Sequence, residues 1–210
     1  MRRYPLKTIL AIVTLFTLII LPFLSVFAAG SWVEQDVGTL QSLRAIAKTD
    51  GTLVAGGNTG YLMRSQDDGA TWLRVDQFAS SWWQDLEVEP DNDVIAVGDG
   101  GSYAVSSNAG ATWTSFSLGV SVNLFDVERN GSYGYIVGDS GTALYYSSNA
   151  NNWYTATTGV TDALYAVQDM GDGTAWMAGA GGRLLRVSQS GLSFANLGRV
   201  VVDNIRGVYF

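Results

Sequence analysis

The 210-residue chain contains no cysteine and no histidine. The absence of cysteine excludes a disulfide framework and a lipoprotein cysteine, so the fold must be stabilised by packing. The absence of histidine excludes Ser-His and Cys-His nucleophilic mechanisms and a histidine-ligated zinc site. Only 15% of the residues are charged, whereas 12% are aromatic and 25 residues are glycine. This balance is typical of a tightly packed β protein that is rich in turns.

Positive charge is also scarce. After residue 28 the chain carries nine Lys and Arg against 19 Asp and Glu, a net charge of −10. This excess argues against a nucleic-acid partner, because binding to phosphates needs clustered cations. The acidic residues are scattered through the turns, so we attribute them to solubility and not to a particular ligand.

The N-terminal 28 residues resemble a secretory signal. A cationic start, "MRRYPLK", precedes the apolar run "TILAIVTLFTLIIL", which Pro22 ends, and Val26 and Ala28 are suitable residues for cleavage after Ala28. We therefore expect residues 1–28 to be a signal peptide and the protein to be exported, to the periplasm or the extracellular space. The alternative is an uncleaved anchor, because residues 9–27 are nearly long enough to span a bilayer.

Repetition is the strongest feature of the rest of the chain. The stretches "SQDDGATW", "SSNAGATW", "SSNANNW" and "SQSGLSF" begin at serines that are 41 residues apart. The aromatic residues that close these stretches keep nearly the same period, and one precedes them: Trp32, Trp72, Trp113, Trp153 and Phe194. A Gly-x-x-Gly turn recurs in phase at 57–60, 98–101, 138–141 and 179–182. A period of this length predicts a repeat architecture.

Each repeat is composed of short β-rich runs separated by Gly, Asn, Asp and Ser. Four strands in about 40 residues is the size of a propeller blade, so we predict an all-β propeller with blades at about 43–77, 83–118, 124–158 and 164–198. Two apolar positions mark the first strand of each blade. The first is Leu43, Trp83, Leu124, Leu164 and Ile205, and the second, three residues later, is Ile46, Leu86, Val127, Val167 and Val208.

The two best-preserved stretches fit the pattern Ser-x-Asp/Asn-x-Gly-x-Thr-Trp. This pattern resembles the Asp-box, or bacterial neuraminidase repeat, and the whole repeat is similar to that of the photosystem II stability/assembly factor-like family. Sortilin and xyloglucanase propellers are more distantly similar. The resemblance covers residues 31–210, although the third and fourth boxes are degenerate. It implies a seven-bladed propeller that binds a protein partner and acts as a scaffold.

The boxes are predicted to have a structural role. Their central position changes from Asp67 to Asn108, Asn149 and Ser190, and only the first of these could act as a general acid or ligate a hard metal. A turn needs only a side-chain oxygen that accepts backbone N–H bonds, which all four supply. The structural set is Ser65, Asp67, Gly69, Thr71, Trp72, Ser106, Asn108, Gly110, Thr112, Trp113, Ser147, Asn149 and Trp153. We expect no catalytic residue, no metal and no cofactor, and we interpret "EPDND" (89–93) as a turn.

A set of variable positions supplies the candidate binding site. The residue after the first apolar marker changes in every repeat, and variation at a fixed scaffold position is how repeat proteins carry recognition. Trp82, beside the core position Trp83, is expected to be exposed and to contact a ligand. The predicted ligand-binding residues are Arg44, Trp82, Gln84, Phe125, Tyr165 and Arg206. We expect them around one mouth of the propeller channel.

These features favour an exported, non-catalytic scaffold that binds a protein or peptide partner in the cell envelope. The alternative is a propeller that binds or hydrolyses a glycan, as xyloglucanases do. In that case Asp85 and Asp126, which occupy equivalent positions, would be the two carboxylates that glycoside hydrolysis requires. The membrane would be involved only through an uncleaved N-terminal segment.

The two ends of the repeat region predict an incomplete, open propeller. Trp32 is in phase with the fourth-strand aromatics, so residues 31–37 should be an orphan outer strand. Residues 205–210 should be the first strand of a truncated fifth blade. Four blades and this remainder do not make the usual ring, and we expect the chain to be part of a longer protein.

Overall fold

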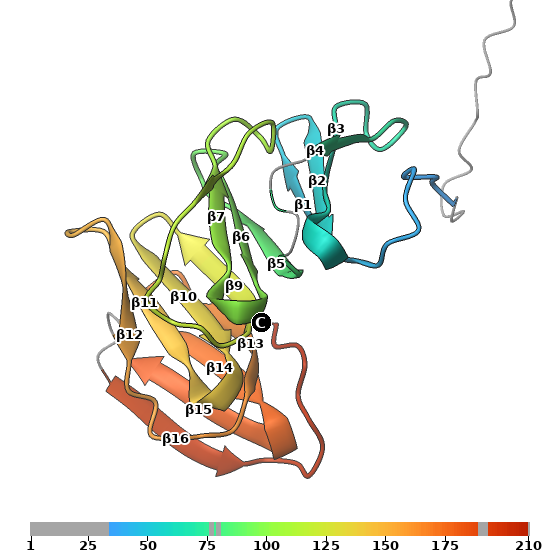
Figure 1. Ribbon diagram of the computed structural model, residues 1–210. Coiled ribbons are helices and arrows are strands. Elements are labelled where there is room, and N and C mark those ends of the chain that lie inside the picture. The colour runs from blue at the N-terminus through green and yellow to red at the C-terminus, as the bar shows by residue number, and fades with distance from the viewer. Residues whose placement is uncertain (1–33, 76–77, 79–80, 189–192, 210) are drawn as a thin grey trace, which may run out of the picture. The chain divides into compact units, whose positions relative to one another are not determined.

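The computed structural model describes residues 34–75, 78, 81–188 and 193–209. These residues form four antiparallel sheets of four strands each, and in each sheet the strands pair in chain order (Figure 1). The first sheet contains β1 (Leu43–Thr49), β2 (Thr52–Gly57), β3 (Leu62–Ser65) and β4 (Leu73–Val75), and the second contains β5 (Trp83–Val88), β6 (Val94–Gly98), β7 (Tyr103–Ser106) and β8 (Thr114–Ser115). The third contains β9 (Leu124–Asn130), β10 (Tyr133–Gly138), β11 (Ala143–Ser147) and β12 (Asn152–Ala156), and the fourth contains β13 (Leu164–Asp169), β14 (Ala175–Gly179), β15 (Arg183–Ser188) and β16 (Ser193–Arg199). The predicted all-β fold, built from four-stranded units of about 40 residues, is confirmed.

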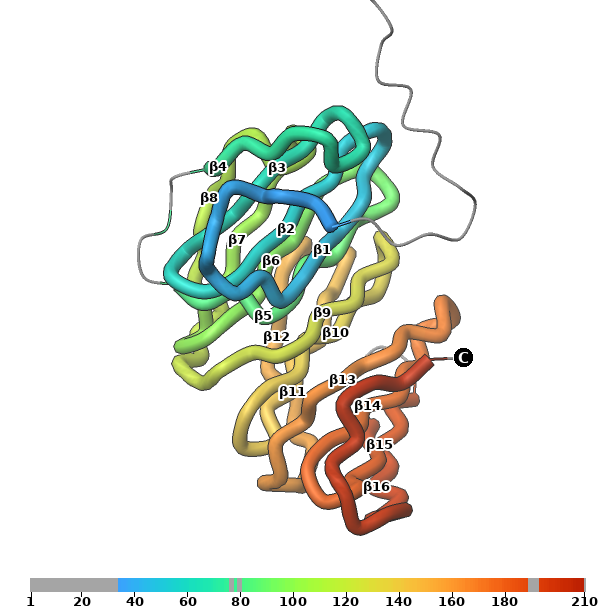
Figure 2. Tube along the Cα trace, turned by 90° about the vertical axis from the view of Figure 1, so that its right-hand side faces the viewer, coloured from blue at the N-terminus to red at the C-terminus, as the bar shows by residue number. Residues whose placement is uncertain are grey.

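The apolar core lies between successive sheets. The first strands β1, β5, β9 and β13 follow one another from sheet to sheet (Figure 2). Between the second and third sheets, for example, Ile95 and Val97 of β6 and Leu124 and Ile136 of the third sheet are all buried in one cluster. Successive apolar residues of a strand point to opposite faces of the sheet, so both faces of a sheet between two others pack against a neighbour. The burial of these residues supplies the main driving force for folding.

The Gly-x-x-Gly segments form short 3₁₀ turns, η1 (Asn58–Gly60), η2 (Asp99–Gly101), η3 (Asp139–Gly141) and η4 (Ala180–Gly182). Each joins the second strand of its sheet to the third. The last glycine of the turn has a positive φ, +71° at Gly141, and a Cβ there would lie 2.0 Å from the carbonyl oxygen of Val160. The segment that enters the next strand therefore packs directly on the turn, which explains why glycine recurs at this position.

One apolar marker is not buried as its repeat position predicts. Ile46 of β1 is 63% exposed, whereas Leu86, Val127 and Val167 at the equivalent positions are at least 95% buried. In the described residues no further sheet packs against this face of β1, so the first sheet lacks the neighbour that covers the others.

The segments that flank the four sheets are not strands where the structure describes them. Residues 34–42 and 201–209 have no strand assignment, whereas the sequence suggests strands at 31–37 and 205–210. The backbone N–H of Ile205 donates a hydrogen bond to the carbonyl of Gly179, but among the described residues no ladder partner extends this contact. A strand needs a continuous partner, and these segments have none within the described part of the chain.

The signal-peptide or anchor segment, residues 1–28, lies outside the described residues, as do Trp32 and Ser190. Among the residues that are described, no helix has the length and apolarity needed to cross a membrane.

Candidate functional site

The variable positions after the first apolar markers lie in one line across the sheets. Arg44 Nη1 donates a hydrogen bond to Gln84 Oε1 over 3.0 Å. The rings of Phe125 and Tyr165 are 5.3 Å apart between centroids, and the Arg206 guanidinium lies 4.8 Å from the Tyr165 ring centroid. The structure therefore brings these five candidate residues into two contact groups, one on the first two sheets and one that begins on the third.

Trp82 extends the first of these groups. Its side chain is 40% exposed, whereas its neighbour Trp83 is 1% exposed and belongs to the core. The Arg44 guanidinium carbon lies 5.7 Å from the Trp82 ring centroid, a cation–π distance. The first group thus presents a cation, an indole face and the Gln84 amide on neighbouring sheets.

The 3₁₀ turns hold the first of these groups in place. Arg44 Nε donates to Asn58 Oδ1 in η1, and Gln84 Nε2 donates to Asp99 Oδ1 in η2, at 2.9 and 2.7 Å. Asn123, which immediately precedes β9, bonds both to Asp139 of its own turn and to the Gly100 N–H of the previous turn. The side chains after the markers and the turns therefore belong to the same edge of the sheets.

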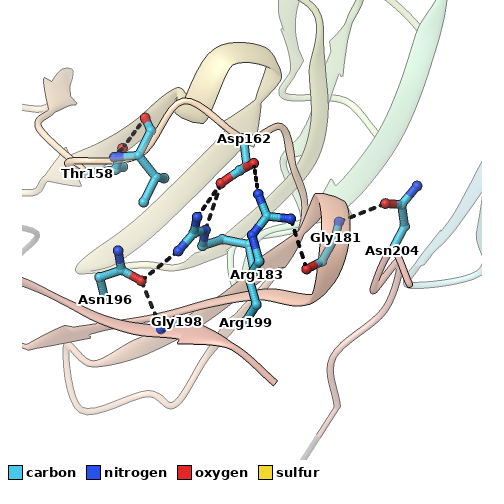
Figure 3. Close-up of polar contacts among 9 residues, drawn as sticks. Thr158, Asp162, Gly181, Arg183, Asn196, Gly198, Arg199 and Asn204 are labelled. Atoms are coloured by element: carbon cyan, nitrogen blue, oxygen red, sulfur yellow. Dashed lines mark hydrogen bonds and ion pairs between the residues drawn. The ribbon is translucent and has the colours of Figure 1, made fainter. Parts of the chain in front are cut away.

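An ion-pair cluster occupies the same edge on the fourth sheet (Figure 3). The Asp162 carboxylate lies 2.7 Å from Arg199 Nη2, and its other oxygen accepts from Arg183 Nε over 2.8 Å. These two arginines hold the pKa of Asp162 below its usual value, with the Arg183 hydrogen bond as the larger cause. Beside this cluster, Asn204 Oδ1 accepts from the Gly181 N–H, as Asn123 Oδ1 accepts from the Gly100 N–H two repeats earlier.

The first strands of the sheets, which we call the inner strands, carry partly buried carboxyl groups that connect the sheets. Asp85 Oδ2 accepts from the Val127 N–H over 3.0 Å, and Asp126 Oδ2 accepts from the Val167 N–H over 2.7 Å. Burial, the nearby charge of Asp85 and a hydrogen bond between the two carboxyls raise the pKa of Asp126 to about 9. Asp126 is therefore protonated at neutral pH, and the two side chains connect each of these first strands to the next.

A second acidic pair lies two residues further along the same strands. Burial, followed by the charge of Glu128, raises the pKa of Glu87 to about 8. Burial also raises the pKa of Glu128, which accepts hydrogen bonds from Gln168 Nε2 and from the Asp169 N–H. Among the described residues, no group of three or more acidic side chains has an arrangement that could hold a metal ion.

The first two Asp-boxes form the side-chain networks of a folded turn. Asp67 Oδ1 accepts from the Thr71 N–H over 2.8 Å, and Asn108 Oδ1 accepts from the Thr112 N–H over the same distance. Ser65 Oγ and Ser106 Oγ accept from the N–H groups of the box glycines Gly69 and Gly110, and the indoles of Trp72 and Trp113 donate to the carbonyls of these glycines. Because aspartate and asparagine accept the same backbone N–H and both also bond to the Thr hydroxyl, the geometry favours a structural role for the boxes.

The third box differs from the first two. It lacks a residue and the glycine, and among the described contacts the side chain of Asn149 makes no hydrogen bond. Trp153 remains buried, but its indole N–H donates to the Tyr103 hydroxyl of the second sheet over 3.0 Å. Ser147 and Asn149 therefore do not reproduce the network of the other boxes, although Trp153 packs between sheets as expected.

The sequence analysis missed three features of this region. Glu87 and Glu128 occupy the same repeat position, so aligning the repeats would have revealed them. Asn123 and Asn204 likewise each precede a first-strand marker. The contacts of Asp162 with Arg183 and Arg199 break the repeat, and no periodic signal could have indicated them.

Solved structures with the same fold were found, whereas no protein-family model and no curated protein matches the sequence. YCF48 bound to a D1 peptide superposes with a TM-score of 0.60 at 20% identity, and YCF48 from Cyanidioschyzon merolae with 0.59 at 11%. These alignments cover 79 and 83% of this chain, and 56 and 61% of the YCF48 chains.

An enzyme and the extracellular domain of a one component system have similar folds as well. An ancestral GH74 enzyme matches with a TM-score of 0.63 at 15% identity over 78% of this chain, and the extracellular domain of a one component system from B. thetaiotaomicron with 0.66 at 12% over 84%. This chain spans 26% of each of those two chains and little more than half of the YCF48 chains. At these identities the likeness concerns the fold, and it identifies the four sheets as blades of a β-propeller.

Proposed function

We propose that the protein is an exported propeller scaffold that binds a protein or peptide partner in the cell envelope. The observation that carries this proposal is the row of variable positions, in which Arg44 contacts Gln84, Phe125 contacts Tyr165, and Tyr165 contacts Arg206. Rigid turns support the row, and aromatic and arginine side chains dominate it. Such residues are the ones that supply most of the energy at protein interfaces.

The partner should present a carboxylate beside an apolar side chain. Arg206 is exposed, and within the described residues its guanidinium nitrogens have no hydrogen-bond acceptor. An arginine fork that stacks on a tyrosine is suited to a carboxylate, and the Phe125 and Tyr165 rings are suited to an apolar neighbour. The similar fold of YCF48, which has been solved with a bound D1 peptide, supports a peptide as the ligand.

Selection from a peptide-display library on the immobilised protein tests this proposal. The enriched peptide is synthesised, and its affinity is measured by fluorescence anisotropy for the parent protein and for Tyr165→Ala. We expect the substitution to weaken binding at least about tenfold, as for the loss of an interfacial anchor. The control is Phe116→Ala, an exposed aromatic residue on another part of the surface, which should leave the affinity unchanged. Equal affinity for the parent and Tyr165→Ala would show that the row is not the binding site for the peptide.

A second candidate, a glycoside-hydrolysing propeller, is suggested by the likeness to the GH74 enzyme and by the carboxyl pair Asp85 and Asp126. Their geometry favours a structural role instead. Each group accepts a backbone N–H from the next first strand. The Asp85 side chain also acts directly on Asp126 and raises its pKa, whereas the two carboxyl groups of glycosidases are about 5 Å or more apart and flank a substrate. Release of reducing sugar from xyloglucan that disappears in Asp126→Asn would establish the enzymatic alternative.

A further inference from the structure

A cavity of about 570 Å³ opens between the outer parts of the second and third sheets. Its lining comes from four places in the chain. These are the β5–β6 turn with Asp91 and Asp93, the strands β7 and β8 with the segment after them, Arg129 on β9, and the third box with the ends of β11 and β12 that flank it. None of these residues belongs to the row of the proposed peptide site, so this cavity is a separate feature. Its volume is within the range of small-molecule sites.

Aromatic rings form a continuous wall of this cavity. Phe116, which is 54% exposed, lies 6.3 Å from Tyr103 between ring centroids, and Tyr103 lies 6.1 Å from Trp153. Trp153 in turn lies 5.4 Å from Tyr146. Three of the rings are at least 92% buried and bonded or packed in place. Only Phe116 offers most of its surface to a ligand, and it does so from a rigid support.

Arg129 places unused hydrogen-bond donors in the same cavity. Its guanidinium carbon lies 3.8 Å from the Tyr146 ring centroid, and Nε lies 3.2 Å from Glu89 Oε2. Among the described residues neither Nη nitrogen has a hydrogen-bond acceptor. Glu89 is itself 97% buried, and its Oε1 has no hydrogen-bond partner in the described part of the chain. Unsatisfied buried polar groups are uncommon in proteins and often indicate a missing ligand or water.

The remaining polar groups supply both donors and acceptors. The side-chain oxygen of Asn151 accepts from the Tyr146 hydroxyl, and that of Asn152 accepts from the backbone N–H of Trp153. The side-chain amide nitrogens of both residues are therefore left to donate. Asp91 and Asp93 contribute carboxylate acceptors. The cavity thus combines an exposed ring face with donors from Arg129 and the asparagines and with acceptors from the aspartates.

Charge decides which class of ligand this combination suits. The single arginine of the lining, Arg129, is already paired with Glu89, and the lining adds the carboxyls of Asp91 and Asp93, so the excess of acidic groups disfavours an anion. A cation would be repelled by Arg129 and would leave its donors and the asparagine amides without acceptors. A neutral sugar carries no charge to be repelled, and each of its hydroxyls both donates and accepts hydrogen bonds, so it can satisfy the donors and the acceptors of the cavity. Its C–H face is also apolar enough to stack on Phe116.

We propose that the cavity between the second and third sheets binds a neutral saccharide, with Phe116 as the stacking platform and Arg129, Asp91 and Asp93 as its hydrogen-bonding groups. This site is independent of the peptide-binding row. With both sites, the protein would bind a peptide partner at one edge of its sheets and a glycan between the outer parts of the second and third sheets.

The test is a titration of the full chain with cellotriose, maltotriose and chitotriose, followed by ligand-observed NMR and calorimetry. We expect at least one of them to bind with a Kd below about 10 mM. Phe116→Ala should weaken that binding about tenfold, and Asp93→Asn should also weaken it. Both positions are at the surface, and an unchanged melting temperature verifies that each variant is folded. The matched control is Tyr154→Ala, which removes a 40% exposed ring outside the cavity lining and should leave the affinity unchanged.

Three results would overturn the proposal. One is that none of the three sugars binds at about 10 mM. Another is that a sugar binds equally well to the parent and to Phe116→Ala. The third is that the cavity takes a lysine tripeptide, used as a cationic probe, more tightly than any of the sugars. Loss of peptide binding in Tyr165→Ala has no bearing on these outcomes, so the two proposals stand or fall separately.

Discussion

The Asp126 carboxylate accepts a hydrogen bond from the backbone N–H of Val167, 2.7 Å away, and so connects the inner strand of the third sheet to that of the fourth. Asp85 makes the equivalent bond one repeat earlier, to Val127. Carboxyl groups on the inner strands, which in an enzyme would suggest catalysis, thus act here as connectors between blades. Ionising both carboxyl groups would cost free energy, because they are partly buried and close together.

This cost makes stability depend on pH. The pKa of Asp126 is about 9 in the folded protein and 3.8 in its ordinary state, and that of Glu87 is also raised, to about 8. Between these limits the folded state holds protons on Asp126 and Glu87 that the unfolded chain releases, so the contribution of these two groups to stability is full at low pH and is lost as pH rises towards 9. We predict that the melting temperature falls steadily from about pH 5 to about pH 9.

Asp126→Asn should remove much of this dependence. Asparagine keeps an oxygen for the Val167 N–H and gains an amide donor for Asp85, without a carboxyl to ionise. At about pH 8 the variant should melt at least about 4 °C above the parent, as measured by calorimetry. The exposed Asp203→Asn serves as control and should follow the parent curve. A variant that melts below the parent at every pH would show that the carboxylate itself is required.

Alanine substitutions at two glycines with nearly the same φ would distinguish the effect of a steric clash from that of backbone strain. Gly141 has a φ of +71°, and a Cβ there would lie 2.0 Å from the Val160 carbonyl oxygen. Gly159 has a φ of +73°, and nothing lies within 4 Å of its added Cβ. Gly141→Ala should therefore lower the free energy of unfolding by about 2–4 kcal/mol, and Gly159→Ala by about 1 kcal/mol. Urea denaturation measures both values, and equal losses would argue against close packing of the turn.

The Asp-box prediction concerns Asp67. Its carboxylate accepts from the N–H and the hydroxyl of Thr71, and Asn108 makes the corresponding contacts with Thr112 in the second box. We expect Asp67→Asn to melt close to the parent and to bind the selected peptide with unchanged affinity. Asp67→Ala should melt lower, because it leaves the turn N–H without its acceptor. A folded Asp67→Asn that has lost peptide affinity would mean that the box is part of a binding site.

Much of the fold could be predicted because its determinants are local and periodic. The 41-residue spacing of the box serines predicts the four-stranded unit, and the Gly-x-x-Gly turns indicate where the second strand ends. The prediction that Ile46 is a core position was wrong because its burial is not a local property. Its environment depends on whether another sheet covers that face, which the repeat position alone does not determine.

The candidate sites were less predictable than the fold. The row from Arg44 to Arg206 could be found because it occupies one repeat position. The cavity beside Arg129 could not, because it combines a turn, three strands and a degenerate box whose side chains meet only after two sheets have packed. The unpaired atoms of Glu89 and Arg129 are properties of that packing and have no counterpart in the sequence.

Amide hydrogen exchange of the protein with and without the selected peptide tests the central claim most directly. If the row is the binding site, the peptide should slow exchange in residues 42–44, 82–84, 123–125 and 163–165, which precede and begin the inner strands. Exchange in the outer strands β8 and β12 should be unchanged. Protection confined to the outer strands, or a bound peptide that protects none of these segments, would contradict the account.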